Sequence, residues 1–231
     1  MDEKLKKYQI LDATTLKIIA AVIMVIDHMG YMFFPRVIWL RKIGRISMPI
    51  FAFFISEGFA HTKDRRRYLC RMLLFAVISE LPFDLAFYGK VYWRYQNVMF
   101  SFSLAILALL LVEKGRGFGT WWSRALGLAG GAGCAWAATR LGTDYGYYAV
   151  VLVMVFYIFR NVGTVYSNGA AVIFQVLTHP KDVQTWSIVS FFPLMLYNGK
   201  KGRGLKWLFY LFYPGHLLVM YVLRMLIYHY W

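Results

Sequence analysis

A histidine lies inside the first long apolar stretch of this sequence, where a polar side chain is costly. His28 directly follows Asp27 and comes eleven residues after Lys17. In a helix, this spacing puts Lys17 and His28 within about 20° of one face and roughly 16 Å apart along the axis. A neutral imidazole at that depth can take a proton from an amine or a hydroxyl group, so His28 is a candidate general base.

Two questions about these residues stay open. Adjacent helical residues point about 100° apart, so Asp27 can orient His28 only if the local geometry brings the two side chains together. Alternatively, His28 has a structural role, hydrogen-bonded within a helix bundle, and Lys17 extends to the membrane interface.

Carboxylate and amide side chains occupy the next apolar stretches. Glu57 lies in the second stretch, and Asn97 opens the fourth, where it can cap a helix or line a cavity. Glu80 and Asp84 stand four residues apart in the third, so they share a helix face unless Pro82 breaks the helix. These residues either line a functional site or join nearby arginines in a structural ion-pair network.

More polar residues border or interrupt the apolar stretches. Arg45 and Arg71 precede or follow basic loops and can pair with the buried carboxylates. Near the C-terminal end, Tyr213 and His216 enclose a Pro-Gly pair inside an apolar run. Because proline and glycine break the helical ladder, we expect backbone groups to face a cavity there. His216 is the second histidine at membrane depth.

The elements that must position these residues are transmembrane helices. The 231 residues are 60% apolar and 19% aromatic, above the share of an ordinary soluble domain. The apolar residues fall into blocks that approach the length of a bilayer crossing. We predict one all-α domain over residues 1–231, a polytopic helix bundle with about nine transmembrane segments (eight to ten), some of them short or broken. The segments are 15–34, 46–60, 68–88 (interrupted at Pro82), 97–112, 122–139, 145–159, 165–177, 185–197 and 207–228.

The charge is strongly basic, with a formal net charge of +15 from 26 Lys and Arg against 11 Asp and Glu. The basic residues lie between the apolar blocks, which is typical of membrane loops that contact anionic lipids. We therefore predict a multi-pass protein of the cell membrane and no nucleic-acid partner. The side that bears the N-terminus collects more Lys and Arg than the other, so we predict a cytoplasmic N-terminus.

Several enzyme classes are excluded by missing motifs. The sequence has no His-Glu-x-x-His metalloprotease motif and no glycine-rich phosphate loop before a lysine. It also lacks a Gly-x-Ser-x-Gly nucleophile elbow and any metal-ligand spacing, so we predict no metal site. Without a candidate nucleophile, direct group transfer with a histidine as general base is the remaining catalytic interpretation.

The polar residues described above belong to short sequence blocks spread along the chain. The blocks include DATTLKIIA (12–20), MVIDHMG (24–30), GRISMPIFAF (44–53), ISELPFD (78–84), NVMF (97–100) and FYPGHL (212–217). Each block alone is a weak signal. Together they resemble the TraX family over nearly the whole chain.

This resemblance implies a multi-pass membrane protein with a fold similar to a wider superfamily of transmembrane acyltransferases. The studied function of the TraX family is N-terminal acetylation of conjugative pilin, which implies acetyl-CoA as cosubstrate here. Superfamily members that O-acylate sugars carry an arginine at the spacing of Lys17, so this chain keeps the charge but not the fork geometry. The implied site places His28 and Asp27 at the reaction, Lys17, Arg45 and Arg71 at the CoA or the oxyanion, and Glu57, Glu80, Asp84, Asn97, Tyr213 and His216 around them.

The acceptor and the function class stay open. An acetyltransferase could modify the amine of a pilin-like protein or another small peptide, or a hydroxyl of an envelope sugar. A proton-coupled transporter would use the same buried groups as a relay, although the missing internal repeat counts against it. A structural assembly factor of a conjugation or secretion apparatus would use them only to pair helices.

Overall fold

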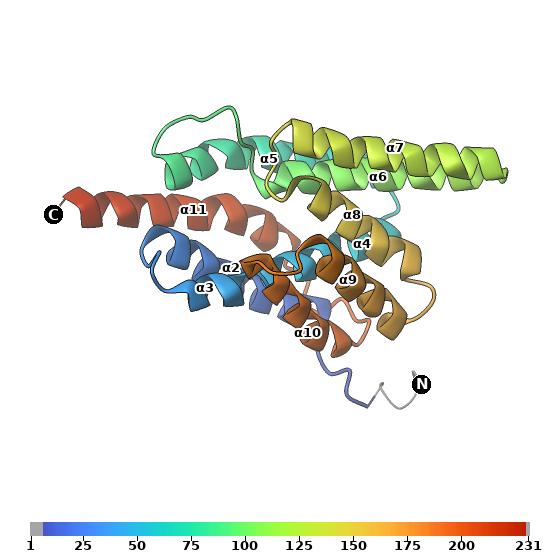
Figure 1. Cartoon of the computed structure of the whole chain (residues 1–231), viewed down its shortest axis with the longest axis horizontal. Helices are drawn as coiled ribbons and strands as arrows, with labels where there is room; N and C mark the ends of the chain where they lie inside the picture. Colours follow the sequence, from blue (N-terminus) through green and yellow to red (C-terminus); the bar gives the residue numbers. More distant parts are fainter. Residues whose placement is uncertain (1–6, 230–231) are drawn as a thin grey trace.

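The computed structural model describes the backbone of residues 7–229 and the side chains of residues 7–227. These residues form a bundle of helices without β-strands (Figure 1). The helices are α2 (Ala13–Met32), α3 (Ile38–Gly44), α4 (Ser47–His61), α5 (Arg65–Tyr88), α6 (Val98–Gly117), α7 (Trp121–Arg140), α8 (Gly146–Phe159), α9 (Thr164–Thr178), a 3₁₀ helix (Val183–Ser190), α10 (Phe191–Met195) and α11 (Lys206–His229).

The all-α architecture predicted from the sequence is confirmed. Each predicted apolar segment falls on one of these helices, the eighth on the 3₁₀ helix and α10. Among the described residues, four stretches are long and apolar enough to cross a membrane: Ala13–Met32, Ile38–His61, Val98–Gly117 and Lys206–Ile227. The other helices are shorter or more polar, so nine crossings stay a prediction.

Two expectations about irregular backbone were wrong. The segment between the first two apolar blocks is not a charged loop, because α3 forms there and packs against α2. Gly30 allows this approach, since a Cβ on it would lie 2.6 Å from Leu40 Cβ. The prolines do not break their helices either: α5 continues through Pro82, and α11 continues through Pro214. Both helices therefore reach the opposite end of the bundle.

The helices α2 and α11 begin at the same end of the bundle. Asp12 caps α2 by accepting a hydrogen bond from the Thr15 amide at 2.7 Å. The Thr14 hydroxyl donates to the carbonyl groups of Lys201 at 3.0 Å and Arg203 at 2.6 Å, just before α11. Because these hydrogen bonds hold the starts of both helices together, the middle turns of α2 and α11 are close enough for their side chains to touch.

Close packing by glycine joins α6 and α7, which lie side by side (Figure 1). A Cβ on Gly127 would lie 2.8 Å from the Leu111 carbonyl oxygen, and one on Gly115 would lie 2.3 Å from the Ser123 carbonyl oxygen. Glycines on both helices thus let the two backbones approach closely.

This contact gives a stability prediction. We expect Gly127→Ala to lower the free energy of unfolding by about 1–3 kcal/mol, because the added methyl group meets backbone atoms that cannot move aside. Thermal unfolding in detergent would measure this as a lower midpoint temperature. Gly133→Ala on the same helix is the matched control, since a Cβ there meets nothing within 4 Å. Equal midpoints for the two variants would contradict the packing argument.

Candidate active site

Two histidines from distant parts of the sequence form the centre of the site. His28 in α2 and His216 in α11 lie with Nδ1 of the former 2.9 Å from Nε2 of the latter. The rings are stacked, with centroids 5.0 Å apart and planes 13° from parallel. Phe87 in α5 packs against His28 with the two rings perpendicular and their centroids 5.2 Å apart. The site is therefore built where α2, α5 and α11 meet.

Hydrogen bonding assigns a proton to each ring. Nδ1 of His216 lies 2.8 Å from the carbonyl oxygen of Phe212, one turn earlier in α11. A carbonyl oxygen only accepts, so this Nδ1 carries a hydrogen, and Nε2 of a neutral His216 is an acceptor. His28 must then donate from its own Nδ1, which leaves the lone pair on His28 Nε2. A histidine in this tautomer is prepared to accept a proton.

Asp27 is directed away from His28 and binds two arginines. Its Oδ2 lies 2.6 Å from Nη2 of Arg45 and 2.9 Å from Nη1 of Arg41. Arg41 also donates to the Asp27 carbonyl oxygen at 3.2 Å. The structure therefore places Asp27 in an ion pair on the neighbouring helix face. The partner that sets the tautomer of His28 is His216, which the sequence marked only as a nearby polar residue.

Gly44 makes room for this buried ion pair. Asp27 is 5% exposed, and a Cβ on Gly44 would lie 2.1 Å from its Oδ1 and 2.2 Å from its Cβ. The carboxylate therefore packs directly against the last turn of α3. A side chain at position 44 would separate α3 from α2 and shift both arginines.

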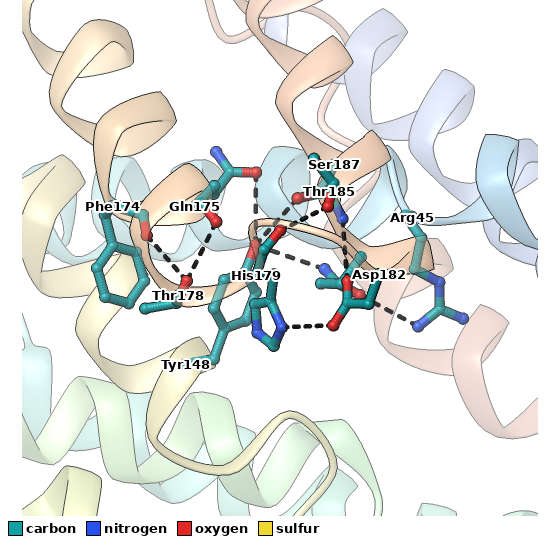
Figure 2. A network of polar contacts seen from close by, with 10 residues as sticks. Arg45, Tyr148, Phe174, Gln175, Thr178, His179, Asp182, Thr185 and Ser187 are labelled. Carbon is teal, nitrogen blue, oxygen red and sulfur yellow. Dashed lines mark hydrogen bonds and ion pairs between the residues drawn. The ribbon is translucent and has the colours of Figure 1, made fainter.

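Arg45 connects the ion pair to the other half of the bundle. Its Nη1 donates to the Tyr145 hydroxyl at 3.1 Å and to Gln184 Oε1 at 3.3 Å. Gln184 donates to the Tyr148 hydroxyl at 3.4 Å, which lies 3.2 Å from the hydroxyl of Ser187. Figure 2 shows this polar network, which runs from Arg45 to the residues around the 3₁₀ helix.

Tyr145 and Gln184 were not among the residues predicted from the sequence. Tyr145 has a φ of 63°, which is unusual for a residue other than glycine, and it stands between Asp144 and Gly146 in a tight turn. A bulky aromatic residue inside a Gly-Thr-Asp-Tyr-Gly run was the available signal. Gln184 sits in a short 3₁₀ helix that no sequence period marks.

Asp144 adds a second carboxylate that interacts electrostatically with Arg45. The Tyr95 hydroxyl donates to its Oδ1 at 3.0 Å. Burial raises the pKa of Asp144 to about 6, and the nearby Arg45 and the hydrogen bond from Tyr95 oppose this rise. Arg45 thus interacts with two acidic groups, of which Asp27 is in direct contact.

The acidic residues of α5, Glu80 and Asp84, bind the segment between α5 and α6. Glu80 Oε2 accepts hydrogen bonds from the Asn97 side chain at 2.5 Å and from its backbone amide at 3.1 Å. Asn97 in turn caps α6 by accepting from the Met99 amide at 3.0 Å. Asp84 accepts from the Tyr92 amide at 2.8 Å. These contacts hold residues 89–97 onto α5 and leave Glu80 and Asp84 without a direct contact to the histidines.

Three other predicted residues, Lys17, Glu57 and Arg71, lie away from the histidine pair, toward the end of the bundle where α2 and α11 begin. Lys17 lies over the rings of Phe54 at 4.9 Å and Phe209 at 5.7 Å, and it interacts electrostatically with Glu57. Arg71 is hydrogen-bonded to Tyr210, near the start of α11. Lys17 and Arg71 are thus not gathered around His28, whereas Arg45 is close enough to interact with it electrostatically.

Tyr213 stays beside the histidine pair. It is 5% exposed, and its ring meets His216 at a centroid distance of 5.6 Å and an angle of 61°. It therefore forms part of the wall that holds His216 in place.

The comparisons with known proteins point to one family. The sequence model described as TraX protein matches residues 12–224. A probable fimbrial assembly protein, FimC of serogroup H1 from Dichelobacter nodosus, is 29% identical over 90% of this chain and 93% of its own length. Protein TraX from Escherichia coli is 27% identical over 46% of this chain and 42% of its own length. No solved structure matches the chain at a significant level.

The tight contact at Gly44 makes a testable prediction. We expect Gly44→Ala to destabilise the protein by about 3–5 kcal/mol, because the methyl group displaces Asp27 from its arginines and leaves buried charges unpaired. Thermal unfolding in detergent would report the loss. Gly117→Ala, at a glycine where a Cβ meets nothing within 4 Å, is the control. A Gly44→Ala protein as stable as this control would show that the carboxylate does not need the space.

Proposed function

Since this chain belongs to the TraX family, we propose that it is a membrane acetyltransferase that transfers the acetyl group of acetyl-CoA to an amine or a hydroxyl, with His28 as general base. The acceptor is the N-terminus of a pilin-like protein or another small peptide, or a hydroxyl of an envelope sugar. The observation that supports this function best is the hydrogen-bond chain from the Phe212 carbonyl through His216 to His28, which leaves a lone pair on His28 Nε2.

In this mechanism His28 moves one proton. Its Nε2 accepts the proton of the attacking amine or hydroxyl while the nitrogen or oxygen bonds to the thioester carbonyl carbon. His28 then gives that proton to the sulfur as the carbon–sulfur bond breaks, so free CoA and the acetylated acceptor leave. Throughout the reaction His216 accepts a hydrogen bond from Nδ1 of His28 and keeps the imidazole oriented.

Arg45 is our candidate for stabilising the oxyanion. Its two terminal nitrogens are engaged by Asp27, Tyr145 and Gln184, and its buried Nε has no hydrogen-bond partner among the described residues. A preorganised cationic donor next to a general base is what acyl transfer requires. Asp27 acts through Arg45, as a positioning residue.

The remaining cationic residues suit the CoA phosphates. Lys17 and Arg71 lie near the end of the bundle where α2 and α11 begin, and Lys201 and Lys206 interact electrostatically with this group. We propose nine membrane crossings with the N-terminus in the cytoplasm, so that CoA meets these residues first and its thioester extends toward His28.

A second candidate function is that of an assembly factor without catalysis. The full-length similarity to a protein named for fimbrial assembly favours it. In that case the buried charges only hold helices together, and removal of the His28 imidazole leaves function unchanged.

His28→Ala separates the two functions. We expect the variant to bind acetyl-CoA with the affinity of the wild type. Its rates of acetyl transfer and of acetyl-CoA hydrolysis should fall by about 10²–10⁴-fold, because the general base is missing. The measurement uses purified protein in nanodiscs with labelled acetyl-CoA and a panel of amines and sugars. A well-folded wild-type protein that binds no acetyl-CoA would refute the proposed activity, and full turnover by the variant would remove His28 from the reaction.

Two substitutions of His216 test whether this residue orients His28 during the reaction. We expect His216→Ala to lower kcat by about 10–100-fold with little change in KM for acetyl-CoA, because His28 loses its orienting partner. His216→Gln should recover part of that loss, since an amide can accept from His28 and donate to the Phe212 carbonyl at once. If both variants lose activity equally, or if KM alone changes, His216 does not act through the orientation of His28.

A further inference from the structure

A long groove lies on the outside of the bundle, on helices that do not carry the histidines. It has a volume of about 770 Å³ and is bordered by α5, α6, α7 and the loops at one end of them. Apolar side chains of α5 and α6 form its walls, among them Leu69, Leu73, Phe100, Leu104 and Leu107. The volume is that of a site for one small ligand.

One end of this groove is cationic. Arg94 from the α5–α6 loop and Arg140 at the last turn of α7 both border it, and both are exposed. Neither forms an ion pair with a carboxylate in the part of the chain that the structure describes. The groove therefore combines an apolar channel with two available positive charges at one rim.

Backbone contacts fix these arginines relative to each other. The Gln96 amide donates to the Gly142 carbonyl at 3.0 Å, and the Asp144 amide donates to the Gln96 carbonyl at 2.8 Å. Gly142 has a φ of +66°, and a Cβ on it would lie 2.4 Å from the Arg94 carbonyl oxygen. The two loops are thus paired tightly, so the rim is a rigid element.

The surroundings of the rim match the level of lipid headgroups. Trp93 is 80% exposed next to Arg94, and the guanidinium of Arg140 lies over the ring of Trp136 at 5.7 Å. Exposed tryptophans beside arginines are typical of the membrane–water interface. From Phe100 to Leu107 the groove follows α6 for about 10 Å toward the middle of the bundle.

The walls favour an acyl chain over a peptide. Inside the groove Ser103 is the polar side chain of α6, and its hydroxyl already donates to the Met99 carbonyl at 2.8 Å. The apolar part therefore offers no free side-chain donor to a peptide backbone, whose carbonyl groups would lose their hydrogen bonds there. A hydrocarbon chain has no such requirement.

We propose that this groove is a binding site for an anionic phospholipid. Arg94 and Arg140 bind the negatively charged phosphate of the headgroup, and one acyl chain lies along α6 between Leu104, Leu107 and the leucines of α5. Basic pockets between membrane helices bind anionic headgroups by the same chemistry. The site does not depend on the acetyltransferase proposal, since it shares no residue with the histidine centre.

Native mass spectrometry of the purified full chain tests this site. The protein in detergent is titrated with phosphatidylglycerol or with phosphatidylcholine of the same acyl chains. We expect phosphatidylglycerol to be retained more strongly, on the order of tenfold, because two arginines contribute to its binding. The double variant Arg94→Gln/Arg140→Gln should lose this preference. Arg124→Gln, which removes an exposed arginine from the same helix α7 outside this groove, should keep it.

A second variant tests the apolar channel without changing charge. Leu104→Trp fills the groove and should reduce retention of phosphatidylglycerol while thermal unfolding stays cooperative. Equal retention of the two lipids by the wild-type protein would overturn the proposal. So would an unchanged preference in the double arginine variant, or an equal loss in Arg124→Gln.

Discussion

The carboxylate of Asp27 is held by Arg41 and Arg45 where α2, α3 and α4 meet. In a membrane interior such a group must be paired, because one unpartnered buried charge costs about 3–5 kcal/mol. Gly44 provides the space for it, and Arg45 extends the pairing to Tyr145 and Gln184. The residue after Asp27 is His28, so the direction in which the histidine points follows from this ion pair. The position of the candidate site therefore follows from the pairing of the buried Asp27 carboxylate with its two arginines.

The histidine pair shows a different solution to the same problem. Its polar atoms are satisfied in series by a backbone carbonyl and by each other, with aromatic rings of Phe87 and Tyr213 around them. No carboxylate is in contact with either ring in the described part of the chain. The arrangement keeps a basic nitrogen free without adding a charge, which suits a group that must take up a proton and release it again.

Much of the fold was predictable, because apolar blocks and charged loops are linear features of a sequence. The first apolar block predicted α2 and the position of His28 on it. Contacts between remote segments were not predictable in this way. His28 and His216 are 188 positions apart, and neither Tyr145 nor Gln184 lies in a recognisable motif. The breaks predicted at Pro82 and Pro214 do not occur, because tertiary packing keeps α5 and α11 helical through them.

The contact between the starts of α2 and α11 has a consequence for the order of membrane insertion, because these helices are synthesised first and last. When α2 enters the membrane during synthesis, His28 and Asp27 arrive long before the residues that complete their surroundings. Arg41 and Arg45 follow within about twenty residues, so the carboxylate is neutralised early. The partner of His28, His216, is part of α11, which is the last helix to be synthesised. This helix contacts α2 through Thr14 and the segment 201–203. The His28 ring therefore gains its hydrogen-bond partner His216 only at a late stage of insertion, when nearly all of the surrounding bundle is already in the membrane.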